Sequence, residues 1–276
     1  MKGPWGAAPH PVVYWLTAAL LFWIFLRWFE RANLYFPSRA LAAHPGSLGL
    51  KYEELKLKTE DGASIHGWYV ENAPGSPVML VSHGNAGNIG DRLDKLLLFR
   101  KAGASVLFYD YRGYGRSSGT PSEEGTYRDA EAAYRWLTAV KGAPPKRIVF
   151  YGESLGCAVA VELALRREAG GLIVESGFTS TEDMARVVFP FLPARWLIRF
   201  RYDSLAKIPR VRCPVLVMHS PQDDIVPFSM GRKLFMAAPE PKTFFELKGG
   251  HNEGFLDTGP AYEHAIRRFL ASVAAR

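Results

Sequence analysis

A serine between two glycines is the residue of this chain best placed to do chemistry. Gly152-Glu153-Ser154-Leu155-Gly156 fits the pattern G-x-S-x-G, with an apolar run before it and an Ala/Val/Leu-rich run after it. These runs predict a buried strand, a sharp turn and a helix. Such a turn exposes the serine oxygen at the end of a sheet, and side chains two positions away would collide. The pattern therefore predicts Ser154 as a nucleophile.

A second stretch, from Gly115 to Gly119, fits the same pattern around Ser117. Ser117 lies several residues beyond its strand in a glycine-rich loop, and Pro121 follows before a helix can begin. The context favours Ser154, which directly joins a strand to a helix. The competing interpretation of Ser154, as the N-cap of an ordinary strand–helix connection, does not explain the candidate partners downstream.

A serine hydroxyl needs a base, and the base needs an acid that orients it. For a serine on such a turn, the usual order along the chain is serine, acid, histidine. His251 follows a predicted strand and two glycines, whereas His264 lies within a predicted helix and should be exposed. His251 is therefore the candidate base. Asp223 and Asp224 both follow a predicted strand, and the residues alone leave the choice of acid open.

The oxyanion of an acyl-transfer reaction needs two N–H donors. We expect one from the backbone of Leu155 and the other from the backbone of Asn85, in the loop after the third strand. His83 should brace that loop rather than take part in catalysis. The sequence contains no metal-ligand spacing and no phosphate-binding loop, so we expect neither a metal nor a cofactor.

The elements that must position these residues alternate between strands and helices. This order predicts an α/β fold with a mostly parallel, doubly wound sheet and ligands at the carboxyl ends of its strands. The eight predicted strands are 52–58, 64–70, 77–82, 105–109, the stretch before Gly152, 172–175, 214–219 and 244–247. The predicted helices are 91–98, 120–140, the run from Leu155 to Leu165, 228–237 and 260–275. Thr120 should cap its helix, with Pro121 at the first helical position.

The N-terminal segment is apolar on all sides and carries no charge from Val12 to Leu26. Extended to Phe29, it would cover about 28 Å as a helix, close to the thickness of a bilayer core. We expect a membrane anchor at 1–31, a linker at 32–50 and the catalytic domain at 51–276. A cleaved signal peptide and a helix packed on its own domain are the alternatives.

Charge supports a membrane partner. The chain has 276 residues, a formal net charge of +7 and 48% hydrophobic residues. A basic protein favours anionic surfaces, and the sequence shows no module typical of nucleic-acid binding. Arg27, Arg31 and Arg39 follow the apolar segment, which favours a cytoplasmic catalytic domain. The two cysteines, Cys157 and Cys213, are expected in the core.

An aromatic-rich insert at 178–208 should form a short helical cap over the sheet edge. Its candidate substrate-binding residues are Phe178, Phe189, Phe191 and Trp196, with arginines interleaved. Part of this apolar surface must pack on the domain. We expect the same residues to line an acyl-chain site that faces the membrane, with the arginines near anionic headgroups.

Together these motifs resemble the α/β-hydrolase-domain serine hydrolases, especially a membrane-anchored branch with a short cap. The resemblance covers Tyr52 to the C-terminus. The matching stretches are 83–90, 109–115, 152–156, 223–227 and 250–252. In that family the acid lies four residues before the proline of a Val-Pro pair, which points to Asp223. His219-Ser220 departs from the frequent His-Gly, and the family's cysteine-rich lipidated N-terminus is replaced here by an apolar segment.

The resemblance implies an α/β-hydrolase fold and hydrolysis of esters or thioesters, because relatives act on S-acylated proteins or on lipid esters. The expected substrate is therefore a small-molecule or lipid acyl compound. Two other functions stay open. One is a non-catalytic, membrane-tethered binding module on the same fold, and the other is an amidase or peptidase that uses the same three residues.

Overall fold

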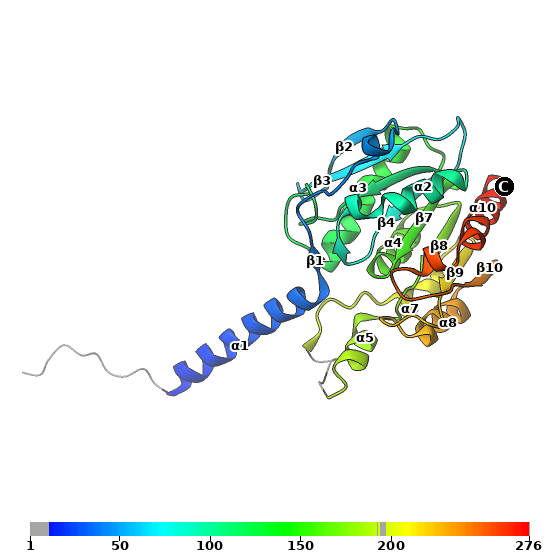
Figure 1. Ribbon diagram of the computed structural model, residues 1–276. Coiled ribbons are helices and arrows are strands. Elements are labelled where there is room, and N and C mark those ends of the chain that lie inside the picture. The colour runs from blue at the N-terminus through cyan, green and yellow to red at the C-terminus, as the bar shows by residue number, and fades with distance from the viewer. Residues whose placement is uncertain (1–10, 192, 194–196, 276) are drawn as a thin grey trace, which may run out of the picture.

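The central feature of the computed structural model, which describes residues 11–191, 193 and 197–275, is an eight-stranded sheet. Its strand order is β10-β9-β8-β7-β4-β6-β3-β2 (Figure 1). The strands are β2 (Glu53–Lys58), β3 (Ser64–Val70), β4 (Val78–Ser82), β6 (Ser105–Tyr109), β7 (Ile148–Glu153), β8 (Gly171–Glu175), β9 (Val215–His219) and β10 (Lys242–Glu246). Only the pairings of β3, with β2 and with β6, are antiparallel. The predicted fold class is confirmed.

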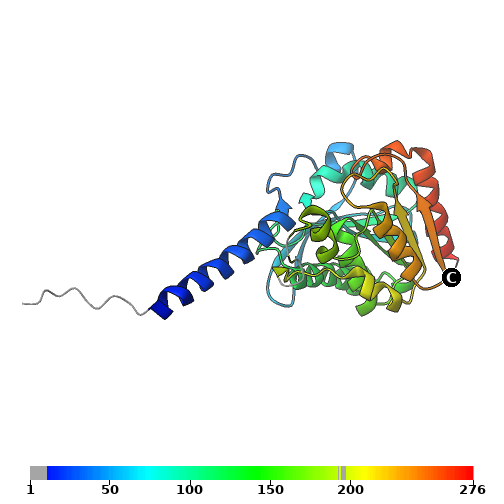
Figure 2. The same ribbon diagram turned by 90° about the horizontal axis from the view of Figure 1, so that it is seen from below.

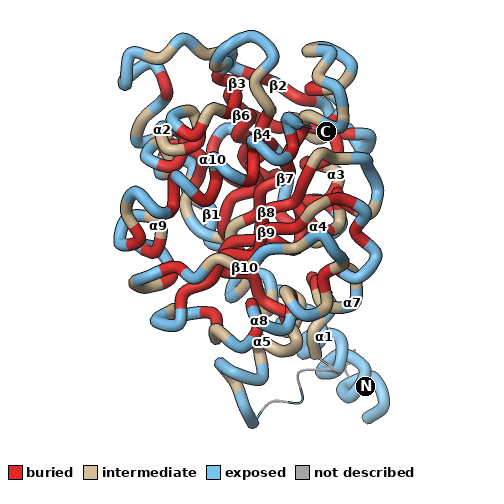
Figure 3. The backbone as a smooth tube through the Cα atoms, turned by 90° about the vertical axis from the view of Figure 1, so that its right-hand side faces the viewer, coloured by how far each residue is buried: buried red, intermediate tan, exposed pale blue. Residues whose placement is uncertain are grey.

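Burial follows the sequence pattern of each strand. Every residue of β4, β6, β8 and β9 is buried, as expected for continuous apolar runs covered on both faces. The edge strand β2 alternates, with Leu55 and Leu57 buried and charged residues exposed between them. Charged side chains on an edge strand discourage pairing with another chain. Figure 3 shows the buried strands enclosed by more exposed helices.

Two apolar clusters lie on opposite faces of the sheet, and each is closed by its own helices. One contains side chains of α3 (Glu123–Ala139), α4 (Leu155–Arg166) and α8 (Phe228–Ala237). The other contains side chains of α2 (Leu93–Lys101) and α10 (Pro260–Ala274). Shorter helices are α5 (Thr181–Val188), α7 (Ser204–Lys207) and α9 (Gly254–Asp257), and 3-10 turns are Pro45–Leu48, Ile89–Arg92, Pro145–Arg147 and Ile208–Arg210.

The start of α3 corrects one prediction. The helix begins at Glu123, and its N-cap is Ser122, whose hydroxyl accepts a hydrogen bond from the N–H of Gly125. Thr120 and Pro121 belong to the preceding loop. Serine is favoured over threonine at the N-cap, which agrees with a start two residues beyond the predicted one.

The N-terminal helix α1 (Pro11–Leu34) projects from the domain, and only its last turns approach it (Figures 1 and 2). It is long and apolar enough to cross a membrane. The helix ends three residues beyond the predicted 31. The chain then joins the domain at once, because β1 (Phe36–Pro37) pairs in parallel with β5 (Ala86–Gly87). Much of the predicted linker at 32–50 is thus part of the domain surface.

Candidate active site

Ser154 sits on the turn between β7 and α4 with φ 53° and ψ −117°. A positive φ is unfavourable for a residue with a side chain, so the surrounding structure must hold this conformation. The N–H of Ser154 donates to the carbonyl of Glu175 at 2.9 Å, and its carbonyl accepts from the N–H of Cys157 at 3.0 Å. The strand-to-helix turn predicted around Ser154 is present.

The two glycines of the motif have no space for a side chain. A Cβ at Gly152 would lie 2.3 Å from the carbonyl oxygen of Gly156, and one at Gly156 would lie 2.0 Å from that of Ser82. Both distances are far below van der Waals contact. Any side chain at these two positions would therefore collide with the backbone, as predicted. The two glycines let α4 start directly against the ends of β4 and β7.

His251 and Asp223 form the pair expected of a base and its orienting acid. Nδ1 of His251 lies 2.8 Å from Oδ2 and 3.0 Å from Oδ1 of Asp223. With Nδ1–H donating to the carboxylate, Nε2 carries the lone pair that a general base needs. The described residues give Nε2 no hydrogen-bond partner. It faces the same cavity as Ser154, since both residues line that cavity.

The structure distinguishes the two candidate acids. Asp223 also accepts hydrogen bonds from the N–H groups of Ile225 (3.0 Å) and Val226 (2.7 Å). Asp224 instead accepts from the backbone N–H of His251 at 3.0 Å, and so braces the histidine loop. Although burial raises the pKa of Asp223, hydrogen bonds from His219 and His251 hold it well below its usual value. Asp223 thus stays ionised beside the imidazole.

The two predicted oxyanion donors, Leu155 and Asn85, both line the cavity that contains Ser154. Leu155 is the first residue of α4, so its N–H has no partner within the helix. The carbonyl of Asn85 accepts from the N–H of Phe36 (3.0 Å) and from the hydroxyl of Tyr114 (2.7 Å). These bonds hold the carbonyl of Asn85 in place. Among the described residues, no acceptor takes the N–H of Asn85.

His83 braces this loop, as expected. Its Nδ1 lies 2.7 Å from the carbonyl oxygen of Gly84, and the hydroxyl of Tyr111 donates to the His83 carbonyl at 2.8 Å. Its Nε2 lies 3.6 Å from Oδ1 of the buried Asp110. Burial, with the nearby Arg92 cation, lowers the pKa of His83 to about 3. His83 is therefore neutral at physiological pH.

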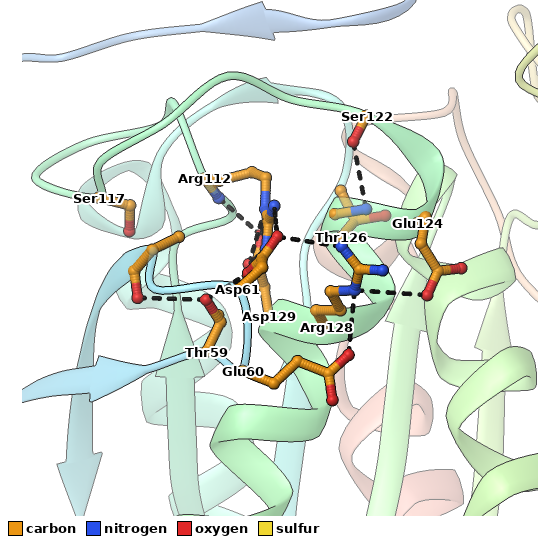
Figure 4. A network of polar contacts seen from close by, with 12 residues as sticks. Thr59, Glu60, Asp61, Arg112, Ser117, Ser122, Glu124, Thr126, Arg128 and Asp129 are labelled. Atoms are coloured by element: carbon orange, nitrogen blue, oxygen red, sulfur yellow. Dashed lines mark hydrogen bonds and ion pairs between the residues drawn. The ribbon is translucent and has the colours of Figure 1, made fainter.

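The second G-x-S-x-G stretch is structural. Ser117 is fully buried; its hydroxyl donates to the carbonyl of Asp110 at 2.7 Å and accepts from the N–H of His66 at 2.8 Å. Figure 4 shows the neighbouring Arg112 reaching toward Asp61 and Asp129. These ion pairs, at 2.8 and 2.9 Å, fix the loop between β6 and α3. Ser117 does not line the cavity of Ser154.

The site opens into a cavity of about 800 Å³ lined mostly by aliphatic and aromatic side chains. Phe178 and Phe189 line it, as predicted. Phe191 does not line it and is 97% exposed, and Trp196 lies outside the described residues. A major contribution comes from α1, for which a membrane anchor was the main prediction and packing on the domain an alternative. The recurrence of aromatic residues at 22, 25 and 29 is the signal that could have revealed this face.

A buried lysine, Lys95, pairs with carboxylates at the strand ends next to the turn. The sequence pattern did not predict it. Nζ of Lys95 lies 2.8 Å from Oε1 of Glu175, 3.1 Å from Oε1 of Glu153 and 3.0 Å from the hydroxyl of Tyr151. Glu153 directly precedes Ser154. Burial alone would raise the pKa of Glu153, but Lys95 and Arg92 outweigh it and lower the pKa to about 2. The charges around the turn are therefore paired.

Across residues 11–191, 193 and 197–275, no group of three or more His, Cys, Asp or Glu side chains is arranged to hold a metal ion. The chemistry that the described residues support is that of a serine nucleophile, a histidine base and backbone N–H donors. An acyl carbonyl placed between Ser154 and the two donors would have one side chain to attack it and two dipoles to stabilise its oxygen.

Comparison with known proteins identifies the family of the chain. The family model described as "Alpha/beta hydrolase family" matches residues 65–205. An uncharacterised protein of Mycobacterium tuberculosis is 40% identical over 248 residues, covering 89% of this chain and 88% of the relative. An uncharacterised membrane protein of Saccharomyces cerevisiae is 34% identical over 251 residues, covering 86% and 88%.

A solved structure of an esterase from Pyrococcus furiosus aligns with a TM-score of 0.72 at 20% identity, covering 86% of this chain and 98% of the esterase. At that identity the likeness concerns the fold. The family match covers about half of the chain, including Ser154, and the relatives at 40% and 34% identity cover 89% and 86% of it. The chain belongs to the alpha/beta hydrolase family.

Proposed function

We propose that this protein is a membrane-anchored serine hydrolase that cleaves carboxylic esters or thioesters with apolar acyl groups. The observation that carries the proposal is one shared cavity. Ser154 on its strained turn and His251 paired with Asp223 open into the same apolar space. Membership of the alpha/beta hydrolase family supports a hydrolase, and the esterase fold likeness is in keeping with it.

In the first half of the reaction, Oγ of Ser154 attacks the acyl carbon while Nε2 of His251 takes the hydroxyl proton. Asp223 stabilises the imidazolium, and the N–H groups of Leu155 and Asn85 stabilise the oxyanion. The carbon–oxygen or carbon–sulfur bond of the substrate then breaks, and His251 gives its proton to the leaving group. The acyl group is now an ester of Ser154.

In the second half, a water molecule attacks the acyl carbon and His251 takes a proton from it. The bond between Oγ of Ser154 and the acyl carbon breaks, the carboxylic acid leaves, and His251 returns the proton to Ser154. His251 acts as base and then as acid in each half, so the imidazole must stay oriented throughout. Asp223 provides that orientation through its bonds to Nδ1 and to the backbone of Ile225 and Val226.

Two features favour acyl esters and thioesters over peptides. The cavity beside Ser154 is walled by aromatic and aliphatic side chains, which suit an acyl chain and leave the polar groups of a peptide unpaired. The helix α1 is long and apolar enough to hold the site at a membrane, and one relative is named as a membrane protein. The N-terminal segment is therefore proposed as an uncleaved anchor.

The test uses a fluorophosphonate probe, which reacts with activated serines. The unaltered protein should be labelled, and Ser154→Ala should abolish labelling because the nucleophile is lost. Ser117→Ala is the control, since it alters the other G-x-S-x-G stretch. Labelling that survived in Ser154→Ala and disappeared in Ser117→Ala would overturn the assignment. A folded protein that never labelled would support a non-catalytic binding module instead.

Matched ester, thioester and amide substrates with the same acyl chain then define the reaction class. Ester and thioester hydrolysis should both depend on Ser154, and the amide should be cleaved far more slowly. Faster cleavage of the amide would replace the proposed class with an amidase or peptidase that uses the same residues.

A further inference from the structure

One face of α1 belongs to the catalytic cavity. Phe22, Leu26, Phe29 and Asn33 recur at intervals of three and four residues, which places them on one side of a helix. All four line the cavity that also contains Ser154 and the other catalytic groups. The ring of Phe29 lies 6.2 Å from the ring of Phe189 in the cap. A helix that served only as a membrane anchor would not need to line the cavity of Ser154.

The contact between α1 and the cap is polar as well as apolar. Oε1 of Glu30 accepts from the N–H groups of Arg199 (2.6 Å) and Phe200 (2.7 Å). Arg27 pairs with Glu30 at 3.0 Å and donates to the carbonyl of Leu197. A carboxylate that accepts two backbone N–H groups forms strong, directional bonds. Arg27 and Glu30 therefore fix the cap segment 197–200 against the helix, and this contact sets the position of the cavity wall.

The cavity edge coincides with the apolar part of α1. Phe22 and Phe25 line the cavity and yet are 59% and 49% exposed, so they mark its mouth. Leu155 and Phe178, near the nucleophile, are buried and mark its floor. The exposed run that begins at Val12 continues without a charge to Phe22 and Phe25. Side chains of that kind are covered by lipid when the helix is in a bilayer.

We propose that α1 is a wall of the acyl-binding cavity as well as an anchor, and that a membrane-resident acyl chain enters the site along its Phe22–Phe29 face. The inference rests on the proposed function and narrows its substrate class. The substrates are long-chain acyl esters or thioesters held in a bilayer, with the acyl carbonyl close to the surface. The chain moves from lipid to the cavity without passing through water, which removes the cost of exposing it.

The experiment uses the full-length protein in phosphatidylcholine nanodiscs and p-nitrophenyl esters from acetate to palmitate. Phe29→Ala removes part of the cavity wall. Trp28→Ala is its matched control, because Trp28 directly precedes Phe29 on the same helix, is 62% exposed and does not line the cavity. Phe29→Ala should lower kcat/KM for palmitate relative to acetate by about tenfold or more, since lost apolar contacts of this size have such effects. Trp28→Ala should leave that ratio unchanged.

A second pair of variants enlarges a side chain instead of removing one. Leu26→Trp places a larger side chain in the cavity and should move the preferred acyl chain to shorter lengths. Leu21→Trp is its control, because Leu21 is 60% exposed and does not line the cavity. Labelling of Ser154 by the fluorophosphonate probe in each variant verifies that the protein is folded and its nucleophile active.

Two failures are distinguishable. If the unaltered protein is neither labelled nor active, the proposed function falls. If it is labelled and active but Phe29→Ala and Leu26→Trp keep the chain-length profile of their controls, α1 is only an anchor and this inference is overturned. Hydrolysis that is fastest with acetate in the unaltered protein, falling steadily with chain length, would also overturn it.

Discussion

Ser154 is held in an unfavourable backbone conformation by hydrogen bonds and ion pairs of the residues around it. Its N–H bonds the end of β8, and the residue before it, Glu153, is paired with Lys95. The candidate base and acid come from the loops after β9 and β10, and His251 lines the same cavity as Ser154. At this scale the reactive oxygen is prepared by bonds that do not involve the oxygen itself, which is how a strained residue can persist.

His83 is the residue whose protonation should affect folding most clearly. Its pKa is about 3 in the folded protein and about 6.5 when unfolded, so the unfolded chain binds a proton first on acidification. The stabilisation is thus complete above pH 6.5 and is lost as the pH falls toward 3. Between pH 7 and pH 5 the unfolding free energy should fall by about 2 kcal/mol from this group alone.

Chemical denaturation of the full-length protein in detergent micelles at pH 7 and pH 5 measures this loss. His83→Asn should reduce the loss, whereas His264→Asn, which alters an exposed histidine, should not. The groups that face His83, namely Asp110, Arg92 and Glu153, are present in both variants and so do not distinguish them. An equal loss in all three proteins would show that His83 is not buried in its neutral form.

The choice between Asp223 and Asp224 shows where sequence reasoning stops at this scale. Both aspartates follow β9 and both contact His251, one through the imidazole and the other through the backbone. Their roles depend on how the loop turns, and that turn is set by the bonds from Ile225 and Val226 to Asp223. Residue types and spacing do not contain this information, although the family resemblance pointed to Asp223.

At the scale of elements, Lys95 joins four of them. It lies on α2 and reaches Tyr151 and Glu153 of β7 and Glu175 of β8, while Tyr262 of α10 donates to Glu175 at 2.6 Å. The cation is buried and every charge near it is matched. A group of this kind fixes the strand ends relative to one another, and Ser154 stands at one of those ends.

Removing the cation should therefore destabilise the protein strongly. Lys95→Met leaves Glu175 buried without its cation and Glu153 with Arg92 alone, at 4.0 Å. The expected loss in unfolding free energy is about 3–5 kcal/mol. Urea denaturation measures it, and slower probe labelling of Ser154 should accompany it. Lys101→Met, on the same helix, is the control, because Lys101 is 72% exposed and should matter little. Similar stability of the two variants would refute the role given to Lys95.

The elements themselves were largely predictable. Apolar runs flanked by turn residues identified the central strands, because a strand covered on both faces has little freedom in composition, and alternation identified the edge strand β2. The start of α3 was not, since the N-cap is Ser122, two residues beyond the predicted Thr120. Lys95 was also invisible, because a lysine on a helix near the surface and one beneath a strand end have the same local pattern. Its burial depends on tertiary packing alone.

At the scale of the whole molecule, α1 has two halves. In the second half, Phe22, Phe25, Leu26 and Phe29 line the cavity. Leu16 and Leu20 in the first half are exposed and do not line it. The sequence favoured a membrane over packing on the domain for the whole helix, because apolar composition is the same whether lipid or protein covers it. Recognising the cavity face needed the position of the cap in space.

Charges placed in the first half should release the protein from membranes. Leu16→Arg combined with Leu20→Arg puts two cations in the bilayer, at a cost of about 5–7 kcal/mol. The unaltered protein should resist alkaline carbonate extraction, and the double variant should be extracted while Ser154 still reacts with the probe. Leu16→Ala with Leu20→Ala is the control and should remain membrane-bound. If the arginine variant resists extraction equally, α1 is not an anchor.

The short connection between α1 and the domain limits how far the domain can move from the end of the helix. Only Tyr35 separates the helix from β1, whose partner β5 follows Asn85 in the chain. With α1 anchored in a bilayer as proposed, a catalytic centre attached this closely would work at a single height above the lipid, because no flexible linker lets it move farther. Substrate headgroups of different size would meet it at different depths, and the two products would part there, the freed fatty acid into the bilayer and the alcohol or thiol into water.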